Sequence, residues 1–140
     1  MAELRAGLPH VVVVLAPGDV CDRVEALGGP TPLRVAPNEV MLVDTGDVDG
    51  ARAAASGAAL VDDVSDAWDS LVLEGPDAAE AFARVSELRL PATGWIQGEV
   101  ARVAAKVLVE AGRITLLVPS NLAAHVEGRL RTDAAEVLTR

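Results

Sequence analysis

The chain reads VDDVSDAWDSLVLEGPDAAEAFARVSELRLP at residues 61–91 and QGEVARVAAKVLVEAGRITLLVPSNLAAHVEGRL at residues 97–130. Gly, Pro or Asp marks each change of hydrophobic period, and the predicted order is strand, helix, strand, strand, helix. Mixed strands and helices with adjacent hairpins favour an α+β fold over a doubly wound parallel sheet. The sequence therefore predicts one α+β domain over residues 1–140, a mixed or antiparallel sheet with packed helices.

The boundaries within this region follow from residue type. Asp69–Glu74 predicts a strand in which Leu71 and Leu73 point to one face and Ser70 and Val72 to the other. Pro76 and Asp77 suit the first turn of a helix whose apolar stripe includes Phe82. The other predicted elements are strands at 100–109 and 114–118 joined by a hairpin around 110–113, a helix from 119–120 to about 131 with Leu122, Val126 and Leu130 on one face, and a last short helix at 133–140.

The first half of the sequence predicts shorter elements. The β-branched run His10–Leu15 indicates a buried strand, and Asp19 is placed to cap a helix from Val20 to about Leu27. An acidic turn is expected at 44–50. The remaining predicted elements are a hairpin of strands at 33–35 and 40–43, a short helix at 51–55 and a strand at 58–64.

Composition excludes several classes of partner. The 140 residues carry a formal net charge of −9, which repels phosphate backbones and anionic lipid, so neither nucleic-acid nor membrane binding is expected. No apolar run reaches the length of a membrane-spanning helix, and the N-terminus lacks the pattern of a signal peptide. The single cysteine, Cys21, fits a reducing compartment, and we expect a cytoplasmic protein.

Candidate reactive groups were weighed against structural roles. A thiol in the first turn of a helix is activated by the helix dipole, but Cys21 has no histidine nearby in sequence, and an apolar packing role is favoured. The acidic turn with Asp44, Asp47 and Asp49 fails the spacing of a calcium loop at both ends, which favours a solvated turn.

The remaining acidic and imidazole groups give no better site. The carboxylates of Asp62, Asp63, Asp66 and Asp69 do not share one helix or strand face, so they are expected to terminate elements rather than to form an acid–base pair. The only histidines, His10 and His125, lack a third ligand, and no metal site is predicted.

The segment Gly94–Gly98, GWIQG, is the one loop with an exposed-anchor pattern. A Trp and an Ile flanked by glycines in a surface connection are costly to leave in water, and aromatic anchors are enriched in interfaces. Trp95 either serves such an interface or folds back onto a core that is poor in aromatic residues. Both alternatives remain open at this stage.

Several short motifs resemble those of the glycine-cleavage T-protein superfamily. Asp63-Val64-Ser65 followed by Leu71–Ala78 is similar to its "D-V-S", strand and "G-P-D-A" helix start, and Gly98–Ser120 looks like the hairpin that follows. Pro37–Leu42 looks like "G-P-D-E-W-L", and Leu117–Ser120 like "L-V-P-R-S", of the sarcosine oxidase gamma-subunit family. The resemblance covers about residues 33–130, and it implies part of the T-protein folate-binding fold.

That resemblance also implies a function. The chain would be a non-catalytic, gamma-like small subunit of a hetero-oligomeric, flavin-dependent sarcosine oxidase or a related N-methyl amine oxidase or demethylase. Larger flavoprotein subunits would hold FAD, FMN or NAD, and this chain would contribute no catalytic residue. Its contact residues would be Trp95, Ile96 and Trp68.

The departures from the family pattern limit the folate part of this expectation. The chain is shorter ahead of Pro37, Met41 stands where "P-D-E-W-L" has Trp, and Ala111–Val118 contains no counterpart of the catalytic aspartate of aminomethyltransferases. The cysteine motif of the iron–sulfur-associated branch is also absent. The alternatives are a free-standing folate-binding or aminomethyltransferase-like one-carbon protein with tetrahydrofolate as ligand, and a thiol enzyme using Cys21.

Overall fold

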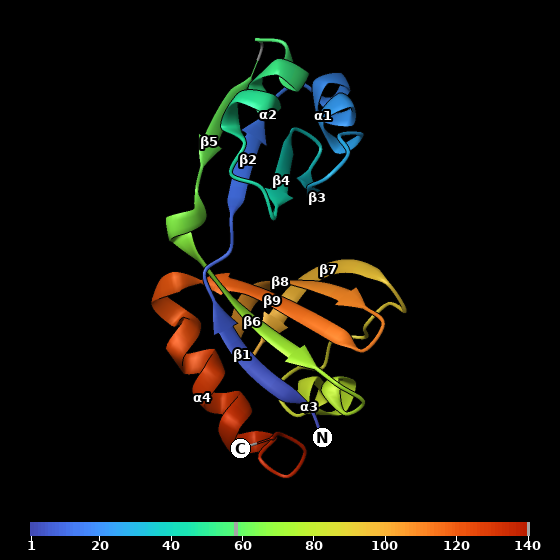
Figure 1. Ribbon diagram of the computed structural model, residues 1–140, viewed down its shortest axis with the longest axis vertical. Coiled ribbons are helices and arrows are strands. Elements are labelled where there is room, and N and C mark those ends of the chain that lie inside the picture. Colours follow the sequence, from blue (N-terminus) through green and yellow to red (C-terminus); the bar gives the residue numbers. More distant parts are fainter. Residues whose placement is uncertain (58, 140) are drawn as a thin grey trace. The chain divides into compact units, whose positions relative to one another are not determined.

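The computed structural model describes residues 1–57 and 59–139, and their contacts divide the chain into two compact units. The first unit combines Met1–Leu8 with Asp66–Arg140, and the second is Pro9–Ser65. Each unit has its own sheet, of five and four strands respectively, and every strand pair in them is antiparallel (Figure 1). The predicted α+β class with an antiparallel sheet is confirmed, whereas the assignment of residues 1–140 to one domain stays a prediction.

The five-stranded sheet of the first unit is built around two long hairpin strands. Its strands lie in the order β1 (Glu3–Gly7), β6 (Trp68–Glu74), β9 (Arg113–Pro119), β8 (Val103–Glu110) and β7 (Gly94–Val100). Alternating residues of these strands, such as Leu71, Leu73 and Leu116, point to one face and join a single buried cluster. That face is the core face of the unit.

Two helices pack on the core face. They are α3 (Ala78–Ala83) and α4 (Ala123–Asp133), the latter preceded by the 3₁₀ turn η2 (Ser120–Leu122). Phe82 is only 1% exposed, and Val126 and Leu130 are fully buried. Leu122, which was expected on the buried stripe, is 39% exposed because it lies in η2, before the α-helical period begins.

Besides the segment Gly94–Gly98, which is considered below, three elements of this unit differ from those that the sequence predicted. β1 was not predicted, and the strand expected at 100–109 is interrupted by a turn at Ala101 and Arg102 that separates β7 from β8. The helix expected at 133–140 does not form over the described part of that segment. Instead, turns lead to Leu138, which bridges to Ala2 beside β1.

The four-stranded sheet of the second unit has β2 at an inner position. The strand order is β3 (Thr31–Ala36), β4 (Glu39–Val43), β2 (Val11–Leu15) and β5 (Leu60–Asp63), and the helices are α1 (Gly18–Glu25) and α2 (Val48–Ala55). The 3₁₀ turn η1 (Ser65–Ala67) follows β5. Both helices supply residues to one apolar cluster with β2, β4 and β5, including Val24, Ala51 and Val12.

One arginine ties α1 to the β3–β4 hairpin. The guanidinium of Arg34 donates to the carboxylates of Asp22 and Glu25 at 2.9 and 2.6 Å, and to the carbonyls of Ala36 and Pro37 at 3.1 and 2.6 Å. The hydrogen bond to Asp22, followed by that to Glu25, raises the pKa of Arg34. A planar five-donor group suits this task better than an ammonium would.

Two helix starts in this unit differ from prediction. Asp19 does not cap α1: the N-cap is Pro17, and Asp19 lies within the first turn. α2 begins at Val48 rather than Ala51, because Asp47 caps it through a hydrogen bond from Gly50 N to Oδ1 of 2.8 Å. The strand expected at 58–64 is β5, and its expected first residue, Ala58, lies outside the described residues.

A pair of glycines allows a stability test of the first unit. Gly75 has φ of +125°, and an added Cβ would lie 2.7 Å from the Met1 carbonyl oxygen, so we expect Gly75→Ala to lower the free energy of unfolding by about 1–3 kcal/mol. Gly128 lies inside α4 with open space around it, so Gly128→Ala should raise that free energy by about 0.5–1 kcal/mol. Urea unfolding measures both, and an unchanged midpoint for Gly75→Ala would contradict the geometry.

Candidate functional site

Both tryptophans of the chain lie on the face of the five-stranded sheet opposite its core face. Trp95 is directly opposite Leu108, Leu108 is opposite Thr115, and Thr115 is opposite Val72. Directly paired residues share a face, and alternation along β6 adds Trp68 to the same side as Val72. Trp68 and Trp95 are both partly exposed. These five residues are called the tryptophan face.

The segment Gly94–Gly98 belongs to strand β7, so its interpretation as a loop was wrong. β7 is an edge strand that pairs only with β8 within the sheet. Ile96 therefore points to the core face, where it packs against the buried cluster, while Trp95 points the other way. The neighbouring residues Trp95 and Ile96 therefore lie on opposite faces of the sheet and do not form one anchor. The interface role of Trp95, Ile96 and Trp68 remains a prediction.

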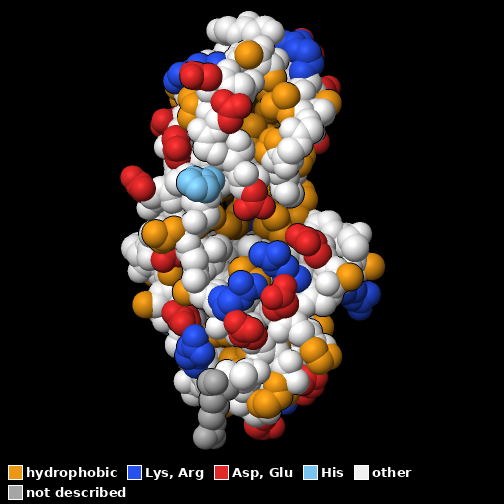
Figure 2. Space-filling model, viewed as in Figure 1, with side chains coloured by type: hydrophobic (Ala, Val, Ile, Leu, Met, Phe, Trp, Pro, Cys, Tyr) orange, Lys and Arg blue, Asp and Glu red, His pale blue; other side chains and the backbone are white. Residues whose placement is uncertain are grey.

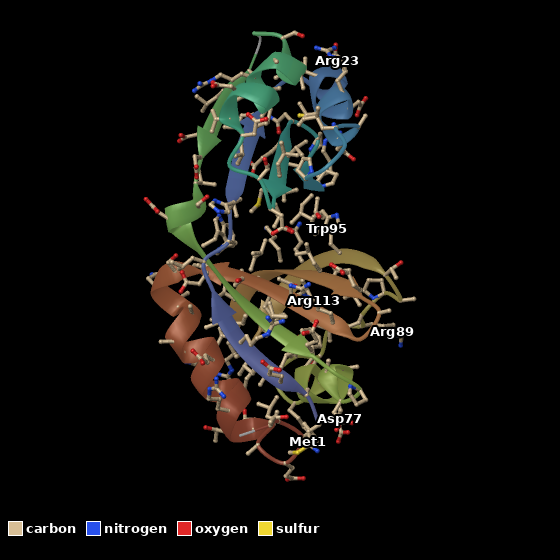
Figure 3. All side chains as sticks on the ribbon, in the orientation of Figure 1. Met1, Arg23, Asp77, Arg89, Trp95 and Arg113 are labelled. Carbon is tan, nitrogen blue, oxygen red and sulfur yellow. The ribbon has the colours of Figure 1, made fainter. Side chains whose placement is uncertain are left out.

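A row of charged residues borders the tryptophan face. Arg113 on β9 lies directly opposite Glu74 on β6 and Glu110 on β8. Glu74 pairs with Arg5 at 2.9 Å, and Arg113 forms no ion pair within residues 1–57 and 59–139. Its Nε is buried without a hydrogen-bond partner (Figure 3 labels Arg113 and Trp95). A buried donor without an acceptor costs about 1–3 kcal/mol. Arg113 as a whole is partly exposed, so a carboxylate from outside would meet its other guanidinium N–H groups rather than the buried Nε.

Figure 2 shows basic and acidic side chains interspersed on the unit that holds this sheet. Mixed charge beside aromatic side chains is suited to recognition of a protein surface, with aromatic and Arg residues as the strongest contributors. Sequence inspection did not find Arg113, since its position between two glutamates depends on the register of three strands. Only the pairing of Glu110 with Arg113 could have been predicted from the sequence, because a hairpin turn around Ala111-Gly112 puts these two residues opposite one another.

Cys21 is buried in the core of the second unit. Its side chain is 0% exposed, and the thiol donates to the carbonyl of Ala16 at 3.5 Å. The thiol packs with Val20 and Val24 among the residues of one apolar cluster. A nucleophile in this position would need an opening of the helix to meet a substrate.

The acidic turn before α2 organises backbone. Asp47 is the N-cap residue of α2, and its own N–H donates to Thr45 Oγ1 at 3.1 Å. Asp44 has φ of +68°, a conformation that Asp tolerates in turns. Throughout the described part of the chain, His, Cys, Asp and Glu form no group of three or more that is suited to a metal ion.

The four carboxylates between β5 and β6 are divided between the two units. Asp62 and Asp63 belong to the second unit, and Asp66 and Asp69 to the first. Oδ1 of Asp63 accepts a hydrogen bond from the Ser65 backbone N–H at 2.9 Å. Hydrogen bonding from the Ser65 side chain, followed by that from its backbone, lowers the pKa of Asp63. This carboxylate thus stabilises the turn after β5.

The two histidines occupy different units. Nε2 of His125, on α4, lies 3.0 Å from the carbonyl oxygen of Ala101 in the β7–β8 turn. His10 accepts a hydrogen bond through its backbone carbonyl from Asp44 N at 2.9 Å. Each therefore has a local structural contact.

Two solved structures share the fold over nearly the whole chain. A chain of the heterotetrameric sarcosine oxidase from Corynebacterium sp. U-96, solved with pyrrole 2-carboxylate, matches with a TM-score of 0.83 and 17% identity, over 96% of this chain and 84% of that chain. The glycine cleavage system aminomethyltransferase T from Bartonella henselae matches with a TM-score of 0.72 and 15% identity, over 99% of this chain and 47% of that chain. This chain thus spans about half of the aminomethyltransferase.

A more distant likeness is to the regulatory subunit of aspartate kinase from Thermus thermophilus, with a TM-score of 0.51 and 14% identity over 93% of this chain and 96% of that chain. No family model matches the sequence, and no curated protein matches it. At these identities the comparisons establish the fold, which is the one that the sequence motifs predicted. Within the described residues, no helix is long and apolar enough to cross a membrane.

The hydrogen bonds at Asp63 predict a pH effect on stability. Because the pKa of Asp63 is lower in the folded state than in the unfolded state, its ionised carboxylate stabilises the folded state. This stabilisation is fully present above the unfolded-state pKa of about 3.9 and is lost as the pH falls through the folded-state pKa. Asp63→Asn should therefore reduce the difference in thermal midpoint between neutral pH and about pH 3. Asp62→Asn, on the same strand, is the matched control and should leave that difference unchanged. Equal pH dependence in wild type and Asp63→Asn would contradict the assignment.

Proposed function

We propose that the chain is a non-catalytic small subunit of a hetero-oligomeric, flavin-dependent sarcosine oxidase or of a related N-methyl amine oxidase or demethylase. The observation that carries this proposal is the likeness to a chain of a heterotetrameric sarcosine oxidase over 96% of this chain and 84% of that one. The high coverage of both chains supports an equivalent place in an assembly. The short motifs at 37–42 and 117–120 support the same assignment.

The partners would be larger flavoprotein subunits that hold FAD, FMN or NAD. Oxidation of the N-methyl amine would take place on those subunits, and this chain would stabilise or position them. On the tryptophan face Val72 and Leu108 are each only 8% exposed, so the contact would be made by the partly exposed Trp95 and Trp68 as aromatic anchors, with Arg113 beside them as a donor to a partner carboxylate. A cytoplasmic location belongs to the same proposal.

The fold also implies tetrahydrofolate as a ligand. Residues 114–118, which follow the β8–β9 turn, however, include no acidic or basic side chain that could activate a folate-bound group. Ile114, Leu116 and Val118 are buried in the core cluster, and only Thr115 is polar between them on the other face. None of these side chains can take up or stabilise a proton on a transferred aminomethyl group. We therefore assign no folate-dependent step to this chain.

A free-standing folate-binding or aminomethyl-transferring protein is the second candidate, favoured by the likeness to aminomethyltransferase T. It predicts that tetrahydrofolate added to the isolated chain changes the fluorescence of Trp95 or Trp68. Titration to high micromolar concentration with calorimetry in parallel is the measurement. We expect neither a fluorescence change nor heat, and saturable binding would replace the small-subunit proposal by this candidate.

The small-subunit proposal predicts a specific complex. The tagged chain, expressed in its own host, should co-purify with subunits that show flavin absorbance and oxidise sarcosine or another N-methyl amine. Trp95→Ala should weaken this association by about 2 kcal/mol or more, the loss typical of a central aromatic contact. Ile114→Val is the matched control, because Ile114 is buried in the core cluster and is not one of the proposed contact residues. A stable isolated monomer that captures no flavoprotein would contradict the proposal.

A further inference from the structure

A solvent-open cavity of 720 Å³ lies on the first unit, and none of the five residues of the tryptophan face lines it. Three parts of the unit surround it: the segment after α3, the β7–β8 turn and α4. Half of its lining residues are ionisable, and they include three of the chain's twelve basic residues. The lining consists of Ala83, Arg84, Val85, Ser86, Glu87, Leu88, Glu99, Ala101, Arg102 and Arg129.

Two of the three arginines are held by exposed ion pairs. Arg84 lies 3.1 Å from Glu80, one helical turn before it, and Arg129 lies 2.7 Å from Asp133, one turn after it. Both guanidiniums remain accessible, with 36% and 45% of the side chain exposed. Exposed pairs of this kind contribute about 0.3–0.5 kcal/mol, so a ligand can engage either arginine without a large loss.

The third arginine sits in a strained turn. Ala101 and Arg102 have φ of +50° and +67°, where a two-residue hairpin turn normally has Asn-Gly. Each left-handed non-glycine residue costs about 1–2 kcal/mol. Arg102 forms no ion pair or hydrogen bond with any residue that the structure describes. A glycine at position 102 would form this turn with less conformational strain. The presence of an arginine there therefore calls for an explanation.

Hydrogen bonds from both sides hold this turn in place. Ala101 N donates to the Val85 carbonyl at 2.7 Å, and its own carbonyl oxygen lies 3.0 Å from His125 Nε2. Ser86 Oγ donates to the Glu99 carbonyl at 2.8 Å and joins the segment after α3 to β7. The wall of the cavity is thus fixed before any ligand arrives, which reduces the entropic cost of binding.

We propose that this cavity binds a phosphate group, either as inorganic phosphate or on a small organic molecule. A phosphate group offers three terminal oxygens, and guanidinium forks from three separate elements, at Arg84, Arg102 and Arg129, match them in number. Glu87 and Glu99 also line the cavity, and three further carboxylates, those of Glu80, Glu136 and Asp133, pair with Arg84 and Arg129. Net charge around the cavity therefore does not attract an anion, and binding rests on direct guanidinium hydrogen bonds. The carboxylates accept hydrogen bonds from a protonated phosphate oxygen or from a hydroxyl of the carrier molecule.

The test uses the purified full chain in phosphate-free buffer at constant ionic strength. Inorganic phosphate and glycerol phosphate are titrated separately, with calorimetry and amide NMR shifts as readouts. We expect saturable binding with a millimolar or lower Kd and shifts at residues 84–88 and 101–102. Tighter binding of glycerol phosphate identifies an organic phosphate as the ligand, and equal or tighter binding of inorganic phosphate identifies the free ion.

The variants separate binding from folding. Arg129→Gln should weaken binding by about tenfold, a loss equivalent to about 1.4 kcal/mol. Arg131→Gln is the matched control, because Arg131 lies on the same helix with the same spacing to Glu127, at 3.0 Å and 50% exposure, but does not line this cavity. Arg102→Gly should relieve the turn strain and raise the thermal midpoint, yet weaken binding by about tenfold as well. Lack of saturation with both probes, or equal weakening by Arg131→Gln, would overturn the proposal.

Discussion

The antiparallel register of β6, β9, β8 and β7 is the constraint on which the first unit depends. Because side chains alternate between faces, one register places Leu71, Leu116 and Val107 in the core and Val72, Thr115 and Leu108 on the tryptophan face. A slip of one residue would exchange the two sets and bury a row of charges. The burial of the core cluster therefore fixes which residues the unit presents on its other face.

Elements with strong local patterns were predicted from the sequence, and the edges of the sheets were not. β6, the start of α3, and β9 are apolar segments with Pro, Gly or Asp at their boundaries, so the local sequence signals agree with the final structure. β7 was missed because Gly94 and Gly98 signal turns, whereas in the structure they lie in an edge strand that is held by β8 on one side. That pairing is local, through the two-residue turn at Ala101 and Arg102, but this turn has neither Asn nor Gly to indicate it in the sequence.

The candidate sites show the same division. Residue type alone identified Trp95 and Trp68, since large aromatic side chains are few in this chain. Register was needed to separate Trp95 from Ile96 and to place Arg113 between two glutamates. The arginine cavity was not visible at all, because Ala101-Arg102 lacks the Asn or Gly that announces a tight turn. Strain of this kind is read only from backbone angles.

The distribution of aromatic residues bears directly on function. Phe82 is the one aromatic residue in the core cluster of the first unit, and the rest of that cluster is formed by aliphatic residues. Both tryptophans instead lie on the opposite face, where they are partly exposed. A core of small side chains gains less from burial than an aromatic one, so placing the two largest apolar groups elsewhere lowers the stability that the unit could reach by itself. Both tryptophans are partly covered within this chain, and further burial of their exposed parts would add to the apolar surface that is removed from water.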